Sequence, residues 1–204
     1  MLLELAFASP SSHCLDYEQM CTVYGASLCH NNSKEELMEF KIKDKQNISK
    51  CCFVCGVENS IGLKAKFYVS EDEETIALFK PRSELQSYPG VLHGGISATI
   101  LDETIGRAIM NKYGQNSFGV TIELNIKYKK PIPTDITLKV VGRITKDKGR
   151  IFEGSGEIYL PDGTVGANAY GKYLKRDLKQ ITDIDFTEDE WFSSDAKTLD
   201  KISI

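Results

Sequence analysis

Several segments of the chain alternate apolar and polar side chains with a period of two, which is typical of half-buried β-strands. Segments with this strand character lie at residues 63–69, 75–80, 120–128, 136–140, 152–160 and 165–174. Pro131 and Pro133 end the third segment, and the turn Pro161-Asp162-Gly163 between the last two suits a tight hairpin. The pattern predicts five or six strands, mostly antiparallel.

One long helix is expected from Ile96 to Met110, where apolar residues fall on almost every side of the helical circumference. The segment before it, residues 87–95, has the Gly and Pro content of a loop. Because such a helix must be buried, the strands have to curl around it, and the chain is predicted to be an α+β domain. Gly106, at mid-helix, would allow a neighbouring backbone to approach closely.

The segment 120–128 has the most regular alternation. One face is predicted to carry Val120, Ile122, Leu124, Ile126 and Tyr128. The opposite face is predicted to carry Thr121, Glu123, Asn125 and Lys127. Thr121 is therefore predicted to lie on the polar face of this strand.

The N-terminal segment contains scattered Cys residues and a single helix signal. Ser33 and Glu36 form a capping box. Apolar residues follow at helical spacing: Leu37, Met38, Phe40 and Ile42. We interpret residues 1–47 as an N-terminal extension with one short helix.

The C-terminal segment is acidic. Residues 177–204 hold eight Asp or Glu against three Lys, and Trp191 and Phe192 are its only large aromatic pair. Such a tail is expected to be mobile or docked only locally. The predicted organisation is an extension over 1–47, a central domain over 48–176 and a tail over 177–204.

Composition and charge narrow the class of protein. A net charge of −4 argues against general nucleic-acid binding, which needs an excess of Lys and Arg. Six Cys in 204 residues are too few for a disulfide scaffold, which favours a reducing compartment. The first eight residues lack a basic signal region, and Asp102, Glu103 and Arg107 interrupt the most apolar stretch. We expect a cytoplasmic protein without membrane or nucleic-acid partners.

The start of the predicted helix is a candidate oxyanion site. His93-Gly94-Gly95 lies where unpaired N–H groups of the first turn and the positive end of the helix dipole converge. A substrate carbonyl can approach Gly94 without meeting a Cβ atom. Hydrogen bonds to a tetrahedral oxygen are worth roughly 3 to 4 kcal/mol in such sites.

Asp102 is the candidate base. A carboxylate inside an apolar helix must be paired, solvated by a cleft or shifted towards its neutral form, and a cleft is the simplest solution. Glu103 is instead expected to form an ion pair with Arg107, four residues on. Asp102 is eight residues from Gly94, or about 12 Å along the helix, so it cannot act on a carbonyl held at that terminus of the same chain. A second subunit, related by a two-fold axis, would supply the partner group.

Three segments carry a resemblance to a known family. They are VLHGGISATILDE (91–103), NIKYKKPIP (125–133) and CFVCG (52–56) with Asn59, Gly62 and Leu63. Together they resemble hotdog-fold acyl-CoA thioesterases of the phenylacetyl-CoA thioesterase type. The resemblance covers about residues 51–176, and its most specific part is the spacing from His93 to Asp102.

The resemblance implies an antiparallel sheet wrapped around one long central helix, and homodimers or dimers of dimers joined by a continuous sheet. It also implies roles for individual residues. Gly94 would donate its backbone N–H to the thioester oxygen, and His93 would orient substrate. Asp102 of the partner chain would act as general base or nucleophile, and Thr121 would position the attacking water. No cofactor and no metal are required for such chemistry.

Other residues are expected to bind the acyl-CoA substrate. Gly95 adjoins the oxyanion site, and Gln86 and Ser87 are the nearest candidates for a second polarising group found in some relatives. Residues 121–150 hold eight Lys or Arg against three acids, the only clearly basic zone of the chain. Its candidates for contacts with coenzyme A phosphates are Lys129, Lys130, Lys148 and Arg150.

Two alternatives remain open from the sequence. Cys52-x-x-Cys55 could be half of a zinc site, or its thiols could be small buried hydrophobes. The residues that could complete four zinc ligands are Cys51, Cys14, Cys21, Cys29 and His30. The domain could also bind an acyl-CoA as a sensor without hydrolysing it, and a dehydratase or dehalogenase on the same fold is a third possibility.

Overall fold

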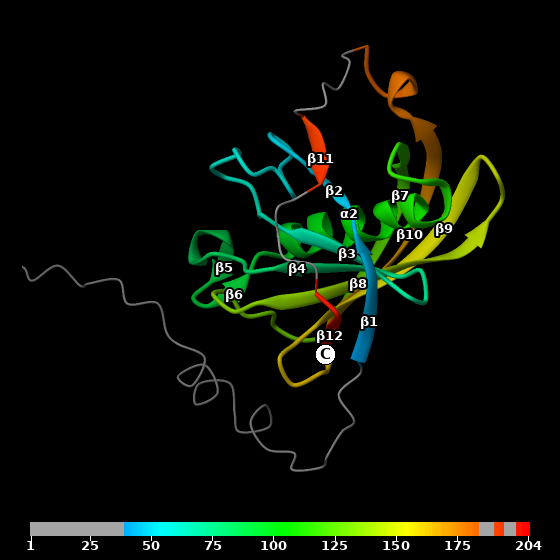
Figure 1. Ribbon diagram of the computed structural model, residues 1–204. Coiled ribbons are helices and arrows are strands. Elements are labelled where there is room, and N and C mark those ends of the chain that lie inside the picture. Colours follow the sequence, from blue (N-terminus) through cyan, green and yellow to red (C-terminus); the bar gives the residue numbers. More distant parts are fainter. Residues whose placement is uncertain (1–38, 184–189, 194–198) are drawn as a thin grey trace, which may run out of the picture.

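The computed structural model describes residues 39–183, 190–193 and 199–204 of the chain. Within these residues one long helix, α2 (Gly94–Tyr113), lies against a curved antiparallel sheet of eight strands (Figure 1). The expected α+β layout, a sheet wrapped around one long central helix, is confirmed. The predicted count of five or six strands is too small, because segments near both ends of the chain join the sheet.

The large sheet has the strand order β12-β1-β3-β4-β8-β9-β10-β7. Its strands are β1 (Glu39–Lys45), β3 (Lys66–Ser70), β4 (Thr75–Phe79), β7 (Ser117–Tyr128), β8 (Leu138–Asp147), β9 (Ile151–Tyr159), β10 (Val165–Asp177) and β12 (Lys201–Ser203). Two small sheets pair β2 (Asn47–Ser49) with β11 (Trp191–Ser193) and β5 (Gln86–Tyr88) with β6 (Val91–Leu92). Short 3-10 helices are η2 (Ser83–Leu85) and η3 (Leu178–Gln180). The predicted hairpin turn joins β9 to β10, with Gly163 in the left-handed region at φ 77°.

Helix α2 forms the centre of the main hydrophobic core. Ile100, Leu101, Ile105 and Ile109 are fully buried there. Strands β4, β7, β8, β9 and β10 all contact the helix, which explains why its sequence is apolar on nearly every side. Within the described residues, no helix combines the length and the apolar composition needed to cross a bilayer.

The end of the N-terminal segment is a strand, not the helix expected there. Phe40 and Ile42 lie in β1, which pairs with β3, while Leu37, Met38 and the capping box lie outside the described residues. Phe40 belongs to a second apolar cluster on the outer face of the sheet, with Tyr68, Ile76, Val141, Tyr159, Ile202 and Ile204. Burial in this cluster and pairing with β3 override the local helical spacing.

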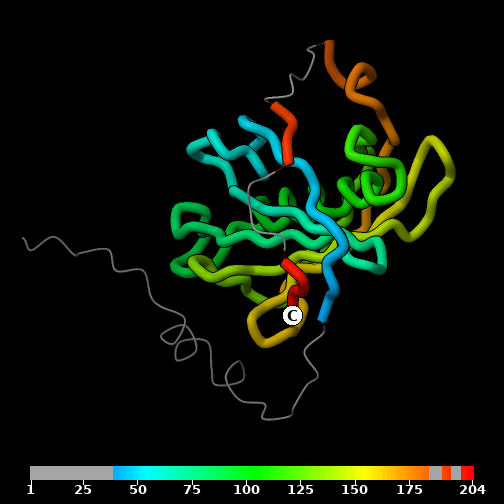
Figure 2. The backbone as a smooth tube through the Cα atoms, viewed as in Figure 1, coloured from blue at the N-terminus to red at the C-terminus, as the bar shows by residue number. Residues whose placement is uncertain are grey.

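The described parts of the acidic tail are docked on the domain. Strand β12 pairs with β1, so the two ends of the described chain lie side by side (Figure 2). Strand β11 pairs with β2, and Trp191 packs against Phe118 with ring centroids 5.6 Å apart. The proposed limits at residues 47 and 177 stay predictions, but both flanking segments contribute strands.

Strand β7 contains a β-bulge at Ile122. The register with β10 shifts between Thr121 and Glu123, so Ile122 is an extra residue and is 51% exposed. After it, Leu124 and Ile126 pack against the core, while before it the hydroxyl of Thr121 contacts α2. The expectation that Ile122 shares the face of Leu124, with Thr121 opposite, is therefore wrong, because the bulge reverses the alternation.

We predict that Ile202→Ala lowers the free energy of unfolding by about 2 to 4 kcal/mol, because it leaves a cavity in the outer cluster. Ile202 is only 5% exposed and pairs with Phe40 across β1 and β12. Urea unfolding of the full chain measures the change. The matched control is Lys201→Ala, which removes only an exposed ion pair with Glu39 and should leave the midpoint almost unchanged. Equal effects of the two variants would contradict a docked β12.

Candidate active site

The first turn of α2 is closed by His93, which caps the helix. Its Nδ1 accepts a hydrogen bond of 2.9 Å from the N–H of Gly95. Its carbonyl accepts the N–H groups of Ile96 and Ser97 at 2.9 and 3.2 Å. Among the backbone N–H groups of the first turn, that of Gly94 is the only one without a hydrogen-bond acceptor in the part of the chain that the structure describes. The amide of Gly95 is committed to the cap, which leaves the amide of Gly94 as the candidate oxyanion donor.

Gly94 lies in a hollow of about 410 Å³ at the helix N-terminus. The hydroxyl of Tyr128, at the end of β7, donates to the carbonyl of Gly94 at 2.9 Å. A Cβ atom on residue 94 would lie 3.4 Å from the Tyr128 ring. The hollow is lined in addition by Tyr88, Val91, Leu92, Ser97, Lys129, Lys130, Pro131 and Ile132. Most of these lining residues are apolar or aromatic, and Lys129 and Lys130 are the charged ones.

Asp102 lies half-buried on α2 in a separate small cleft of about 80 Å³. Its Oδ1 accepts hydrogen bonds from the hydroxyls of Thr121 at 2.8 Å and Tyr173 at 3.2 Å. Burial raises the pKa of this carboxyl, the two donors oppose that effect, and the nearby charge of Glu103 adds to it. A carboxylate so placed is a potential proton acceptor with one oxygen held in position and the other available.

Two features of this site were not predicted from the sequence. The bulge at Ile122 brings Thr121 to Asp102, and no residue in the period-two pattern signals a bulge. Tyr173 is fully buried at an inward position of β10, where the alternation predicts an ordinary core side chain. Its hydroxyl is the only polar group on that ring, and burial with the charge of Asp102 raises its pKa, so it stays a donor.

Within one chain the two halves of the predicted site are apart. Gly94 and Asp102 line different hollows, separated by about 12 Å of helix. Gln86 and Ser87 lie exposed on β5 beside the first of these hollows, and the Gln86 Oε1 accepts the N–H of Gly90 at 2.9 Å. Neither residue is near Asp102, so a second polarising group can serve only the Gly94 side.

The predicted basic residues also form two groups. Lys129 and Lys130 lie at the Gly94 hollow, where the Lys130 Nζ donates to the Thr164 hydroxyl at 2.8 Å. Lys148 and Arg150 lie at the opposite end of the sheet, in the turn between β8 and β9. Arg150 lines a wide hollow of about 770 Å³ there, together with Tyr113, Ser117, Gly149, Lys175, Arg176, Asp177 and Gln180. The four basic residues therefore do not lie together within one subunit.

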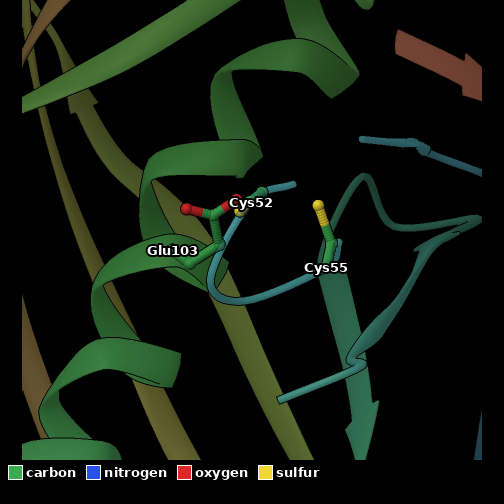
Figure 3. A group of neighbouring side chains, drawn as sticks. All are labelled: Cys52, Cys55 and Glu103. Carbon is green, nitrogen blue, oxygen red and sulfur yellow. The ribbon is translucent and has the colours of Figure 1, made fainter. Parts of the chain in front are cut away.

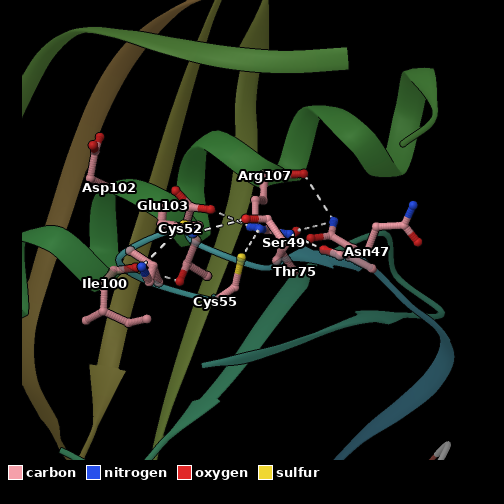
Figure 4. Close-up of polar contacts among 12 residues, drawn as sticks. Asn47, Ser49, Cys52, Cys55, Thr75, Ile100, Asp102, Glu103 and Arg107 are labelled. Carbon is pink, nitrogen blue, oxygen red and sulfur yellow. Dashed lines mark hydrogen bonds and ion pairs between the residues drawn. The ribbon is translucent and has the colours of Figure 1, made fainter. Parts of the chain in front are cut away.

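Glu103 forms the predicted ion pair with Arg107, at 2.7 Å. Arg107 is 3% exposed, and its guanidinium also donates to the Asn47 carbonyl at 2.8 Å and to the Cys55 sulfur at 3.2 Å (Figure 4). Its carbon Cζ lies 4.1 Å from the centre of the Phe67 ring. A buried guanidinium needs this many partners, because an unpaired buried charge is strongly destabilising.

The cysteines considered for a zinc site divide into three sets. Cys52 and Cys55 lie close to Glu103, with the three potential ligand atoms within 4.8 Å of one another (Figure 3). Cys51 is exposed and is not part of this group. Cys14, Cys21, Cys29 and His30 lie outside the described residues. The zinc hypothesis therefore lacks a described fourth ligand.

Comparison with known proteins gives consistent matches. Residues 89–167 match the family model of the thioesterase superfamily. The chain is 32% identical to acyl-coenzyme A thioesterase THEM4 of Mus musculus, covering 69% of this chain and 60% of that protein, and 32% identical to the Rattus norvegicus protein of the same name, covering 72% and 66%. It thus spans about two thirds or less of the length of these curated relatives.

Solved structures agree in fold. A thioesterase superfamily protein aligns with a TM-score of 0.55 at 23% identity, over 77% of this chain and 79% of that one. A Bacillus halodurans protein solved with CoA aligns with a TM-score of 0.51 at 24% identity, over 57% and 77%. At these identities the two structures are similar to this chain in fold.

We predict that Asp102→Asn stabilises the protein at neutral pH. The raised folded-state pKa means that the charged form costs stability once the pH exceeds the unfolded value of about 3.9. The cost grows as the pH rises through the folded pKa, whereas Asn stays neutral and its Oδ1 can still accept from Thr121 and Tyr173. The difference in Tm between variant and wild type should therefore be small at pH 4 and positive at pH 7 to 8, measured by thermal unfolding.

The control for this measurement is Glu39→Gln, which changes an exposed carboxylate that pairs with Lys201 at the edge of the sheet opposite β7. Its Tm difference should stay small throughout the pH series. A pH-independent Tm difference for Asp102→Asn, or a variant less stable than wild type at pH 8, would show that desolvation does not govern this carboxyl.

Proposed function

Since residues 89–167 of this chain belong to the thioesterase superfamily, we propose that the protein hydrolyses an acyl-CoA thioester to a free acid and coenzyme A. The observation that carries this proposal is the half-buried carboxylate of Asp102, oriented by the hydroxyls of Thr121 and Tyr173. A domain that only bound acyl-CoA would have little reason to place a desolvated carboxylate at this position.

The reaction needs a base, a water and an oxyanion donor. Asp102 takes a proton from a water held beside Thr121, and the water oxygen attacks the thioester carbon. The backbone N–H of Gly94 stabilises the oxyanion of the tetrahedral intermediate. The carbon–sulfur bond then breaks, the carbonyl re-forms, and Asp102 returns the proton to the coenzyme A thiolate. Atoms and charges balance with no cofactor in the scheme.

A homodimer built on β7 supplies the geometry that one chain lacks. Strand β7 is an edge of the large sheet. Thr121, near Asp102, lies in its first half, and Tyr128, near Gly94, is its last residue. Antiparallel pairing of two such strands about an axis near Leu124 and Asn125 would place Thr121 opposite Tyr128 of the partner subunit. Asp102 would then face the Gly94 turn of the partner subunit, and the axis would create the site twice.

The same symmetry would unite the two basic groups. The β8–β9 turn with Lys148 and Arg150 lies at the Ser117 end of β7, whereas Lys129 and Lys130 follow its other end. Antiparallel pairing brings these ends together between subunits. The phosphates of coenzyme A would then lie near Lys129 and Lys130 of one chain and near Lys148 and Arg150 of the other. This arrangement gives the acidic protein a local positive site.

The remaining residues support this arrangement. His93 fixes the first turn through its bond to Gly95, so we assign both to positioning the Gly94 amide for the substrate carbonyl. Gln86 and Ser87 on β5 would add a polar contact on the same side. A cytoplasmic location, without membrane or nucleic-acid partners, remains part of the proposal on composition alone.

We predict that Asp102→Asn lowers kcat/KM for acyl-CoA hydrolysis by at least about a hundredfold, as expected for loss of a general base. Release of coenzyme A from a panel of acyl-CoAs of graded length measures it, and the control is again Glu39→Gln, far from β7, which should stay near wild type. Turnover near wild type for Asp102→Asn would remove the assigned role. Tight acyl-CoA binding by the wild type without release would instead indicate a binding domain.

We predict that Gly94→Pro lowers turnover by roughly 10²-fold to 10³-fold, because it deletes the oxyanion donor while keeping the helix start. His93 already has the extended conformation, φ −63° and ψ 134°, that a residue before proline adopts. Far-UV circular dichroism checks the fold. An active Gly94→Pro protein would show that another group binds the oxygen.

Mixing the two inactive proteins tests the shared site. After subunit exchange, Asp102→Asn and Gly94→Pro chains should recover about one quarter of the wild-type rate, since half of the dimers are mixed and each has one intact site. Chromatography of a tagged and an untagged chain confirms the exchange. Exchanged dimers that stay inactive would mean that base and oxyanion donor act within one chain.

A further inference from the structure

Cys52 and Cys55 form a paired-thiol site that the hydrolysis does not use. They lie in the turn that follows β2, and the Gly56 N–H donates to the Cys52 carbonyl at 2.9 Å, which closes the turn. We infer that these two residues are a reversible oxidation site, which forms an intramolecular disulfide by exchange with a small-molecule disulfide.

The two thiols differ in access. Cys55 is 2% exposed, whereas Cys52 is only partly buried and can meet a reagent from solvent. The Val54 N–H donates to the Cys52 sulfur at 3.3 Å. An accessible sulfur held by donors, followed three residues later by a buried sulfur, has the layout of an attacking and a resolving cysteine.

Electrostatics favour the same division of roles. A hydrogen bond from the Cys55 thiol is the main cause that lowers the pKa of Cys52 to about 6, against the effects of burial and the Glu103 charge. That hydrogen bond and burial raise the pKa of Cys55, and the guanidinium of Arg107 opposes this. At pH 7 the accessible sulfur is therefore the thiolate, which is the nucleophile in thiol–disulfide exchange.

The reaction balances in two steps. The Cys52 thiolate attacks one sulfur of the external disulfide, whose sulfur–sulfur bond breaks and releases one thiolate. The Cys55 sulfur, after loss of its proton, attacks Cys52 in the mixed disulfide and displaces the second thiolate. Counted from its dithiol form, the protein loses two electrons and two protons, and the external disulfide becomes two thiols.

Arg107 distinguishes this site from a cation site. Its guanidinium lies 3.2 Å from the Cys55 sulfur and 2.7 Å from the Glu103 carboxylate (Figure 4). A positive group is therefore already in contact with two of the three potential metal ligands. A second cation among these groups would be repelled at short range. Oxidation to a neutral disulfide, by contrast, leaves Arg107 paired with Glu103 and Asn47.

Digestion with trypsin isolates Cys52 and Cys55 in one peptide, in which the disulfide can be detected. Cleavage after Lys50 and Lys64 releases a peptide, residues 51–64, whose only cysteines are Cys51, Cys52 and Cys55. In a full-length Cys51→Ser protein this peptide should carry a disulfide after equilibration with oxidised glutathione at pH 7, should lose a pair of hydrogen atoms by mass, and should return to the dithiol with dithiothreitol. Alkylation before digestion and mass spectrometry give the readout.

Single variants in the same background separate the roles. Cys55→Ser should stop at a glutathione adduct on Cys52, whereas Cys52→Ser should leave Cys55 a free thiol. Iodoacetamide should modify Cys52 in the first variant at least about tenfold faster than Cys55 in the second. Circular dichroism establishes that both proteins are folded, and the dithiol measurement on the Cys51→Ser protein does not depend on either.

Three results would overturn the inference. One is the absence of the Cys52–Cys55 disulfide in excess oxidised glutathione. Another is equal or faster modification of Cys55 in the Cys52→Ser protein. The third is one equivalent of zinc in protein purified without chelator that is lost on Cys52→Ser, which would make the cluster a metal site.

Discussion

The contact between helix α2 and strand β7 depends on Gly119, which faces Gly106 of the helix. A Cβ atom on Gly119 would lie 2.8 Å from the carbonyl oxygen of Gly106, closer than real side chains tolerate. Without a side chain at Gly119, the two backbones approach closely, and this brings Thr121 within hydrogen-bond distance of Asp102. The geometry of the proposed base is thus a consequence of backbone packing next to it. A larger residue at Gly119 would push helix α2 and strand β7 apart without directly contacting the Asp102 carboxylate.

The sequence predicts those features of this protein that depend on residues close together along the chain. The apolar helix, the Glu103–Arg107 pair, the hairpin at Gly163 and the close approach of a neighbouring backbone to Gly106 arise from local spacing, and all are present. The bulge at Ile122 has no local signal, because it exists only relative to the partner strand β10. For the same reason the period-two pattern placed Thr121 on the wrong face.

The segments at the two chain ends lack a local signal for a different reason. Phe40 and Ile202 become buried only against each other and against the outer face of the sheet, so neither segment shows a self-sufficient pattern. An acidic composition describes the average of the tail, whereas docking depends on a few apolar residues within it. Strands β1 and β12 extend the sheet on the side opposite β7, and within the described residues β7 is the other edge, where the pairing between subunits is proposed.

Arg107 connects these regions through one charge. It contacts Asn47 near the N-terminal strands, Cys55 in the thiol turn, Glu103 on α2 and the ring of Trp191 in the tail. Glu103 and Arg107 also line the cleft that contains Asp102. Because a buried charge keeps its partners or pays a large desolvation penalty, a change at any of these contacts must be absorbed by the others. The thiol turn and the carboxylate cleft are therefore both in contact with the same ion pair, Glu103 and Arg107.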